Sequence, residues 1–394
     1  MAALPVLRQS PTDPAFVQNP YPFYARARAA GPLVWWEDYE LVCATRYDLV
    51  HALLRDARFG REQPTEMREP TPDHLAPFYA IEDHSMLEAE GDRHKRLRAQ
   101  ALRGLATKQV RALTPQIEAL CQDLATALPD GPFDLLDHYC RPLPVRMICR
   151  VLGVPEQMAD QLLAWSADMV AMYQARRDRA VEDAAAKASA DFAHYLAGEV
   201  ADRRKAPRDD LLSSMVAAVD DEHALSTDEL IATCILLLNA GHEATVHALG
   251  NAVFLLLRDG IPVEASRIDA TVEEALRLDP PLHLFTRYAY EPCDIAGHHF
   301  QRGDRVGLLL ASAGRDDSTY AENDLFQPHP PRAPHVAFGG GRHFCIGAAL
   351  ARAEMAAALT ALFDRHPTLR LADEPRYANL YHFHGLESLM VRVD

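Results

Sequence analysis

Residues 240–247 read AGHEATVH, and the two histidines and the acid in this stretch are side chains that could bind a metal. A hydrolytic zinc helix uses the spacing H-E-x-x-H, because histidines four residues apart share one face of the helix. His242 and His247 are five residues apart. At about 100° per residue their rings diverge by about 140°, so a shared zinc ion would require a break in the helix. We exclude that site, and the segment requires another explanation.

The sharper chemical signal is FGGGRHFCIGAALARAE, residues 338–354. A glycine cluster before a helix can bind phosphates, but a dinucleotide fingerprint needs a preceding strand and a third glycine at fixed spacing. The preceding PHPPRAPHVA is not typical of such a strand. Cys345 comes just before a helix expected to begin near Gly347, and a helix N-terminus stabilises the thiolate that binds iron. A single cysteine is otherwise most often a small buried apolar residue.

One long helix must position residues 240–247. Ser226-x-x-Glu229 is a capping box, and the helix that it opens meets no breaker until Asp259-Gly260. Such a helix holds about 32 residues and runs about 48 Å, the length of a whole domain. Because it is also apolar, we expect it to be central and buried, with residues 240–247 at its middle.

Apolar spacing predicts further helices over residues 110–124, 157–174, 180–204 and 268–278, the last ending before Pro280. Alternating segments predict short strands near both ends of the chain. These segments are residues 32–45, with a hairpin turn at Glu37-Asp38, and residues 293–300, 304–312 and 378–393. With no repeat and no Gly/Ser-rich linker, we expect one domain over residues 1–394 that is mainly α with minor β.

Composition excludes several classes of protein. Hydrophobic residues at 48% and charged residues at 24% are ordinary for a globular protein, and the net charge of −16 argues against a nucleic-acid binder. The seven cysteines have no C-x-x-C spacing, which favours a reducing cytoplasm over a disulfide framework or a zinc ribbon. There is no signal-peptide pattern, and the most apolar run is about half a bilayer span. We therefore expect a cytoplasmic protein free of membrane.

The cysteine segment matches the pattern F-G-x-G-x-H-x-C-x-G in full. The matching residues are Phe338, Gly339, Gly341, His343, Cys345 and Gly347. The pattern resembles the haem-binding loop of the cytochrome P-450 family, and the resemblance to the soluble bacterial members runs from residues 19–36 to residues 385–393. It implies that family's single-domain fold, with a long central helix over the haem and small β regions. It also implies a haem b whose iron is ligated by Cys345.

Further residues take roles from this resemblance. Glu274-x-x-Arg277 resembles the family's ExxR pair, a buried ion pair that braces the loop under the haem. The pair's usual third partner aligns with Pro330, leaving Arg332 or His329 as substitutes. The haem propionates are expected to be bound by His94, Arg98, Arg287 and His343.

The segment AGHEAT resembles the family's oxygen-activation segment, in which small residues open a groove over the iron and an acid-alcohol pair delivers protons. Ala240 and Gly241 are the small residues and Glu243 is the acid. The alcohol is missing, because Ala244 stands where threonine is usual, and Thr245 is about 100° further around the helix. We therefore expect protons to come through ordered water or from a hydroxyl of the substrate. His242 and His247 are then expected to be core residues.

The resemblance implies a haem-thiolate monooxygenase that inserts one oxygen atom of O2 into a small organic substrate, by hydroxylation or O-dealkylation. The residues expected to face the substrate are Leu236, Asn239, Ala240, His283, Leu284, Phe285, His382 and Phe383. The polar members of this set favour an oxygenated substrate. Two alternatives remain open at this point: a peroxygenase driven by hydrogen peroxide, which the missing alcohol suggests, and a non-catalytic haem sensor or binding protein.

Electrons are expected from a separate ferredoxin or flavodoxin. Basic residues cluster near the propionate-binding helix and around the cysteine loop, and they predict a local basic face that docks an acidic partner. These residues are Arg93, Lys95, Arg96, Arg103, Lys108, Arg342 and Arg352. An ordinary solvated run of charges is the alternative.

Overall fold

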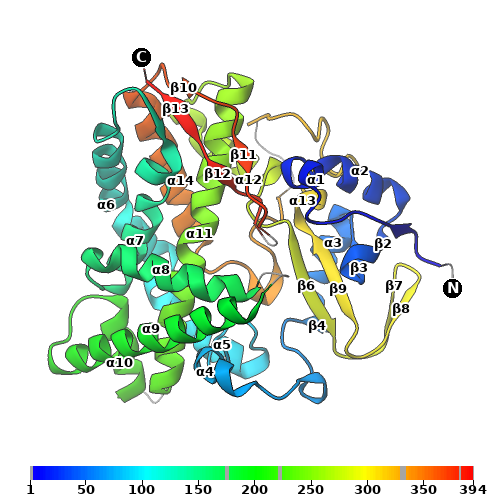
Figure 1. Ribbon diagram of the computed structural model, residues 1–394, viewed down its shortest axis with the longest axis horizontal. Helices are drawn as coiled ribbons and strands as arrows, with labels where there is room; N and C mark the ends of the chain where they lie inside the picture. The colour runs from blue at the N-terminus through cyan, green and yellow to red at the C-terminus, as the bar shows by residue number, and fades with distance from the viewer. Residues whose placement is uncertain (1–2, 174–176, 221–223, 329–333, 381–382, 394) are drawn as a thin grey trace.

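The computed structural model describes residues 3–173, 177–220, 224–328, 334–380 and 383–393. Figure 1 shows two regions: a large group of helices that includes α6 to α11 and α14, and a smaller β-rich region that holds the N-terminal part of the chain. The larger hydrophobic core lies among the helices, and two smaller clusters lie around the main sheet.

The central helix is α11 (Thr227–Asp259), which has 33 residues. Its N-terminus has the predicted capping box: the Ser226 hydroxyl accepts the backbone N–H of Glu229, and the Glu229 carboxylate accepts the backbone N–H of Ser226. It ends at Gly260, whose φ of 63° is the left-handed conformation that glycine adopts easily. Helix α11 contacts α7, α8, α9, α12 and α14, so it is buried along most of its length, as predicted.

The remaining helices surround α11 or cover the sheet. The longer ones are α5 (Gly91–Leu105), α6 (Thr107–Thr126), α7 (Pro142–Leu152), α8 (Ala159–Val170), α9 (Arg179–Lys205), α10 (Leu211–Asp220), α12 (Ile268–Leu278) and α14 (Ala348–Arg365). The shorter ones are α1 (Pro14–Gln18), α2 (Tyr21–Ala30), α3 (Tyr47–Leu53), α4 (Ala76–Glu82) and α13 (Leu310–Ala313). Single turns of 3-10 or π helix are η1 (Glu37–Tyr39), η2 (Thr65–Met67), η3 (Asp73–Leu75), η4 (Leu136–Cys140), η5 (Glu156–Met158), η6 (Ala171–Tyr173), η7 (Ala265–Arg267) and η8 (Gly341–His343).

A six-stranded sheet has the order β1-β2-β3-β9-β6-β4. Its strands are β1 (Val6–Leu7), β2 (Leu33–Trp36), β3 (Leu41–Ala44), β4 (Phe59–Gly60), β6 (Leu284–Ala289) and β9 (Arg305–Leu309). The predicted hairpin is confirmed, because β2 and β3 are antiparallel on either side of η1. Strand β9 is parallel to β3 and antiparallel to β6, so the sheet joins the N-terminal strands to the strand that follows α12.

Three smaller sheets complete the β structure. Strands β10 (Arg370–Leu371), β13 (Met390–Arg392) and β5 (Pro132–Asp134) form one, β11 (Arg376–Tyr377) pairs with β12 (Leu386–Ser388), and β7 (Cys293–Ile295) pairs with β8 (His298–Phe300). The predicted class, mainly α with minor β, is confirmed. Among the helices of the described residues, none is both long enough and apolar enough to cross a bilayer.

Three predicted boundaries were wrong. The helix predicted over residues 157–174 is divided between η5, α8 and η6, because the backbone tightens into 3-10 turns at both ends of α8. The strand predicted over residues 304–312 ends at Leu309, where the chain turns into α13. Within the described part of residues 378–393, only the segments of β12 and β13 are strands.

Candidate active site

The loop that carries Cys345 is shaped by two glycines. Gly339 and Gly341 have φ values of 70° and 65°, which side chains rarely tolerate, and a Cβ on Gly341 would clash with the carbonyl of Leu54. The Cys345 N–H donates to the carbonyl of Phe338 at 2.9 Å, which closes the loop. The glycines therefore hold the sulfur-bearing residue in a tight turn directly before α14.

The Cys345 thiol differs from the other described cysteines. Its side chain is solvent-accessible, whereas the other six are buried: Cys43, Cys121, Cys140, Cys149, Cys234 and Cys293. Surrounding protein nevertheless raises the pKa of Cys345 by desolvation, against the backbone N–H groups of Gly347 and Ala348 and the charges of Arg98 and Arg352, which favour the thiolate. An accessible sulfur that is enclosed by protein faces an internal space, and a bound cation would deprotonate it.

The middle of α11 has one accessible face. Its neighbours Leu237, Leu238 and Val246 are buried, whereas Ala240 is exposed although it lies at the centre of a buried helix. The half-buried residues around it are Leu236, Asn239, Gly241, Glu243 and Ala244. Steps of three and four residues place most of these side chains on one side of the helix. Helix α11 also contacts α14, the helix that follows Cys345, so this accessible side and the cysteine loop belong to neighbouring elements.

The four predicted propionate-binding residues lie near the same loop. His94, on α5, and His343 have ring centroids 4.3 Å apart, and Arg98 donates to the carbonyl of Phe344 at 2.6 Å. Arg287, on β6, is only 3% exposed, and burial lowers its pKa to about 10. A buried cation requires an anionic partner. These residues therefore fit a group that carries carboxylates.

Glu90, which no sequence motif indicated, contacts this cluster directly. Its carboxylate lies 2.8 Å from Nε2 of His343 and accepts from Arg342 at 2.9 Å and from the backbone N–H of Arg61 at 2.9 Å. Burial alone would raise the pKa of Glu90, but these donors and charges lower it to about 2. Because Glu90 and His343 are far apart in the chain, no local pattern could have paired them.

Glu243 is the one acid in the oxygen-activation segment, and desolvation raises its pKa to about 7. Ala244 shares the accessible face of α11, whereas Thr245 is buried, 6% exposed, and its side chain is turned away from that face. The Thr245 hydroxyl therefore does not lie on the accessible face. Among the residues of the accessible face, Glu243 is the one with a titratable side chain.

The two histidines of the segment differ. His242 is buried and its Nδ1 lies 2.7 Å from the carbonyl of Leu238, as expected of a core residue. His247 is also buried, and its ring lies 5.4 Å from that of Phe383. Its Nδ1 has no hydrogen-bond partner among the described residues, so it is a core residue that is not fully satisfied. A Cβ on Gly385 would clash with the His247 ring, which explains the glycine there.

The predicted substrate residues of the described chain lie in two places. One group is on α11 and the other is at β6 and the segment paired with its start. The α11 group is Leu236, Asn239 and Ala240, and the other group is His283, Leu284, Phe285 and Phe383. Leu284 and Phe285 follow one another on β6, and Phe383 lies in a segment that bridges to Leu282. Asn239 contacts the sulfur of Met169, on α8, at 3.8 Å. His382 lies outside the described residues.

His283 makes polar contacts that its predicted role did not include. Its Nδ1 lies 3.1 Å from the Tyr24 hydroxyl and its Nε2 lies 3.9 Å from the Asp279 carboxylate. The ring is thus part of a buried polar cluster with residues far from it in the chain.

The predicted ExxR pair is a buried ion pair. Arg277 donates to Glu274 through Nε at 2.7 Å and through Nη2 at 2.9 Å, and the two side chains are 2% and 3% exposed. Arg277 also donates to the carbonyls of Gly314, Asn323 and Leu325. These bonds tie α12 to the chain that leads to the cysteine loop. The proposed third partners, Arg332 and His329, lie outside the described residues, as does Pro330.

Several of the basic residues predicted to form a docking face are paired with carboxylates, which reduces the positive charge of that face. Arg96 makes a bidentate pair with Glu229 at 2.7 Å, and Lys95 contacts Asp92 at 3.0 Å. Arg342 pairs with Glu90, and Arg352 pairs with Glu273 at 2.5 Å. Arg93 donates to the carbonyl of Asp83. Exposed apolar side chains of Leu102 and Phe344 lie on α5 and in the cysteine loop, so this surface combines apolar and charged groups.

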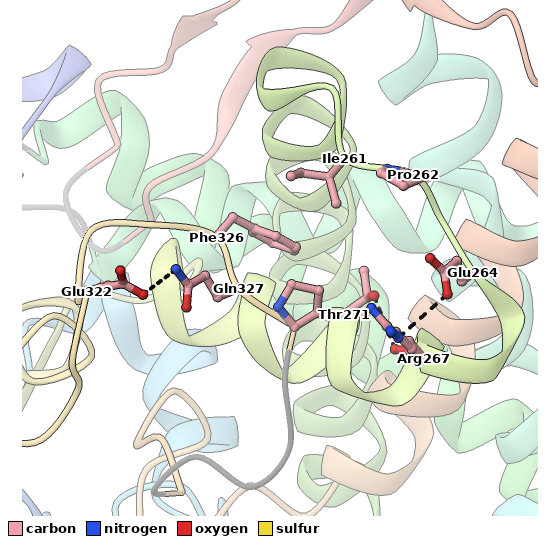
Figure 2. Close-up of a pocket in the computed structure, with 9 residues that line it drawn as sticks. Ile261, Pro262, Glu264, Arg267, Thr271, Glu322, Phe326 and Gln327 are labelled. Atoms are coloured by element: carbon pink, nitrogen blue, oxygen red, sulfur yellow. Dashed lines mark hydrogen bonds and ion pairs between the residues drawn. The ribbon is translucent and has the colours of Figure 1, made fainter.

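A surface cavity of about 490 Å³ lies between the end of α11, the start of α12 and residues 322–328. Figure 2 shows the side chains that line it. Its polar side chains pair with one another: Arg267 lies 3.6 Å from Glu264, and Gln327 donates to Glu322 at 2.5 Å. None of the predicted site residues lines this cavity. The candidate site is therefore the space bordered by the cysteine loop and α11.

Comparisons with known proteins agree with this geometry. Residues 267–371 match the family model described as Cytochrome P450. The chain is 34% identical to cytochrome P450 monooxygenase PikC of Streptomyces venezuelae, over 99% of this chain and 95% of that protein. It is 34% identical to the vitamin D(3) 25-hydroxylase of Pseudonocardia autotrophica, over 96% of this chain and 94% of that protein.

Solved cytochrome P450 structures have the same fold as this chain. The crystal structure of P450BioI in complex with an acyl carrier protein ligated to hexadec-9Z-enoic acid is similar with a TM-score of 0.89 at 30% identity, covering 96% of this chain and 100% of that chain. The crystal structure of CalO2 is similar with a TM-score of 0.90 at 28% identity, covering 98% and 99% of the two chains.

Proposed function

Since the chain belongs to the cytochrome P450 family and is a monooxygenase of the oxidoreductase class, we propose that Cys345 supplies the thiolate that ligates its haem iron. Proteins of this family bind haem through a cysteine thiolate. The observation that carries the proposal is that Cys345 is the one accessible cysteine of the described residues, held in a glycine-shaped loop at the start of α14. Bound haem supplies the iron at which O2 is reduced and from which one oxygen atom is transferred to an organic substrate.

His94, Arg98, Arg287 and His343 are proposed to bind the haem propionates. Arg287 is the strongest member, because it is a buried cation whose side chain donates to the backbone carbonyl of Thr286 and pairs with no carboxylate among the described residues. Carboxylates placed beside it would compensate the desolvation of the guanidinium. Phe338, Gly339 and Gly347 are proposed to shape the loop around the haem. In this arrangement Glu90 competes for His343 and would have to move or share that donor.

Glu243 is proposed to carry protons to the reacting oxygen. A carboxyl whose pKa is raised to about 7 can both hold and release a proton near neutral pH. Ala244 has no hydroxyl to pass that proton on, and the Thr245 side chain is buried. Ordered water or a hydroxyl of the substrate would therefore complete the path.

The substrate is proposed to be an oxygenated organic molecule that lies between the accessible face of α11 and β6. Leu236, Asn239 and Ala240 would contact it from α11, Leu284 and Phe285 from β6, and Phe383 from the segment before β12. Relatives with comparable similarity include the 6-deoxyerythronolide B hydroxylase of Saccharopolyspora erythraea and the nocardicin C N-oxygenase of Nocardia uniformis. The names of these relatives, a hydroxylase and an N-oxygenase of functionalised molecules, support oxygenation of a functionalised substrate over oxidation of a plain hydrocarbon.

A separate ferredoxin or flavodoxin is proposed to supply electrons at the surface around Leu102 and Phe344, with Arg103 and Lys108 at its edge. Exposed apolar groups with basic neighbours suit a transient complex with an acidic protein. Reduction should then slow as ionic strength rises, since exposed charges are screened. The proposed compartment is the cytoplasm, where the buried cysteines would remain reduced.

The proposal is tested by supplying the haem-loaded protein with NADPH, a ferredoxin system and 18O2 in the presence of candidate oxygenated substrates. We expect a product that carries one 18O atom, together with a substrate-induced spin shift in the ferric absorption spectrum. Products formed with hydrogen peroxide but not with the ferredoxin system would instead favour the peroxygenase that the alanine at position 244 suggests. A spin shift without any product under both conditions would favour a haem-binding sensor.

A further inference from the structure

Asp279, His283 and His384 form a buried cluster outside the candidate active site. Asp279 follows α12 directly, His283 precedes β6, and His384 precedes β12. The three residues are 3%, 8% and 7% exposed. One potential metal-ligating atom from each lies within 4.8 Å of the other two. Three parts of the chain thus bring two imidazoles and a carboxylate to one point.

The distances in the cluster are close to those that a bound metal requires. Nδ1 of His384 lies 2.8 Å from Oδ1 of Asp279, and Nε2 of His283 lies 3.9 Å from the same oxygen. A tetrahedral zinc ion with ligand bonds of about 2.0–2.2 Å holds its ligand atoms about 3.3 Å apart. The two distances lie on either side of this value. Each of these two distances would have to change by less than an ångström to reach it.

The imidazole nitrogens are not fully used by the protein. Among the described residues, Nε2 of His283 and Nε2 of His384 are buried without a hydrogen-bond partner. Buried polar atoms normally have a hydrogen-bond partner, so an unpaired one is a candidate to bind a ligand, an ion or a water. The rings of the two histidines are 4.5 Å apart. Nε2 of His283 is the unpaired nitrogen that lies beside the Asp279 carboxylate, at 3.9 Å, and it is the one that a metal bound to that carboxylate would take.

A small cavity lies beside the cluster. It has a volume of about 50 Å³, and Tyr24, His283, Phe383 and His384 are among the residues that line it. This volume is enough for one or two water molecules. A metal in the cluster could therefore take a water as its fourth ligand from this side.

Two tyrosines would orient the carboxylate. Tyr21 donates to Oδ1 of Asp279 at 2.5 Å, and Tyr377 donates to Oδ2 at 2.7 Å. Hydrogen bonds of this kind fix the direction of a ligating carboxylate and are a regular feature around protein metal sites. If these two bonds served only to hold Asp279 in place as part of the fold, the cluster would bind no metal.

We infer that Asp279, His283 and His384 bind a divalent transition-metal ion of the zinc class. The ligands are Oδ1 of Asp279, Nε2 of His283, Nδ1 of His384 and a water in the adjacent cavity. Two imidazoles and one carboxylate are a ligand set that zinc accepts. Binding displaces the proton between His384 and Asp279 to solvent, and no oxidation state changes.

The position of the site gives it a consequence for the proposed substrate region. The backbone N–H of His384 already donates to the carbonyl of Pro281 at 2.8 Å, and Phe383 bridges to Leu282. A metal between His283 and His384 would fix the segment of Phe383 against the start of β6. We expect zinc to alter the size of the spin shift produced by a substrate without displacing the haem.

The test is isothermal titration of the haem-loaded protein with Zn²⁺ after removal of metals by dialysis against a chelator. We expect one zinc per chain, and at least tenfold weaker binding in His283→Asn, His384→Asn and Asp279→Asn. His299→Asn is the matched control, because His299 lies 2.9 Å from Asp294 in an exposed pair on the β7–β8 hairpin. That variant should bind zinc as the parent does.

No stoichiometric binding to the parent protein would overturn the inference, as would equal affinity in the three cluster variants. The absorption spectrum of each variant checks that it retains haem and is folded. If the variants lose their haem, X-ray absorption at the zinc edge of the parent protein decides the question. Two imidazole ligands with oxygen ligands support the site, whereas a sulfur ligand or a shell of oxygen alone contradicts it.

Discussion

Glu274 and Arg277 form a salt bridge of 2.7 Å in which neither side chain is more than 3% exposed. The arginine is also bonded to three backbone carbonyls, and the backbone N–H of Gln327 donates to the glutamate at 2.8 Å. The pair is therefore the point at which α12 is tied to the chain leading to the cysteine loop.

Arg277→Lys should lower the haem content of the purified protein severely. Lysine cannot make the bidentate contact or reach the three carbonyls, and breaking a buried pair costs about 3–5 kcal/mol. The exposed pair of Arg267 and Glu264, also three residues apart and 3.6 Å in length, gives the control Arg267→Lys. Haem per chain, measured by absorbance, should be unchanged in that control. Equal haem content in both variants would show that the buried pair does not brace the loop.

Ala244→Thr should increase coupling, the amount of product formed per NADPH consumed. The new hydroxyl would lie on the accessible face of α11 beside Glu243 and would add the missing proton donor. Peroxide release should fall in parallel. Thr245→Ala is the control, because Thr245 is 6% exposed and does not share that face. If coupling responds to position 245 and not to position 244, the assignment of the two positions is wrong.

Glu243→Gln should slow product formation by on the order of 100-fold, since the variant has no acidic proton to give. Desolvation raises the pKa of Glu243 to about 7, so the parent protein carries this proton below pH 7 and loses it above. Turnover of the parent should therefore fall as pH rises through about 7. The variant should lack this part of the pH profile, and an unchanged profile would exclude Glu243 as the donor.

The buried carboxyl of Glu354 should make the free energy of unfolding depend on pH. It is buried on α14, neither of its carboxylate oxygens has a partner among the described residues, and desolvation raises its pKa to about 8. The folded protein thus keeps a proton that the unfolded chain loses near pH 4.5. By linkage, this group's contribution to the free energy of unfolding falls as pH rises from 4.5 through 8.

Between pH 6 and pH 8 the loss from Glu354 should be about 2 to 3 kcal/mol. Glu354→Gln should remove that part of the slope in chemical denaturation of the haem-loaded protein. Glu118→Gln, at an exposed position on α6, should leave the slope as it is. A difference between Glu354→Gln and the parent that does not vary with pH would mean that the carboxyl is ionised in the folded protein.

Local signals in the sequence were enough to predict the central helix. Ser226 and Glu229 form its capping box and Gly260 ends it, so both boundaries depend on neighbours within four residues. The hairpin at residues 37–38 and the helix before Pro280 were predictable for the same reason. The pairing of β3 with β9 was not, because it joins Val42 to Val306 through contacts that only the folded chain creates.

In the candidate active site, too, the features set by nearby residues were predictable and those set by distant residues were not. The glycines around Cys345 and the spacing of Glu274 and Arg277 are local patterns, and they led to the loop and its brace. Glu90 reaches His343 from far along the chain, and Asp279 gathers Tyr21, Tyr377 and His384 from both ends of it. No periodicity links such residues, so the sequence did not predict the contacts of His283 in that buried cluster.

The most direct test of the account is the absorption spectrum of the reduced protein under carbon monoxide. If Cys345 ligates the haem iron as a thiolate, the carbonyl complex should show the strongly red-shifted Soret band of thiolate ligation, and Cys345→His should shift the band to the position typical of histidine ligation. Folded parent protein that binds no haem, or that shows the histidine-type band, would contradict the assignment of Cys345 and with it the proposed active site.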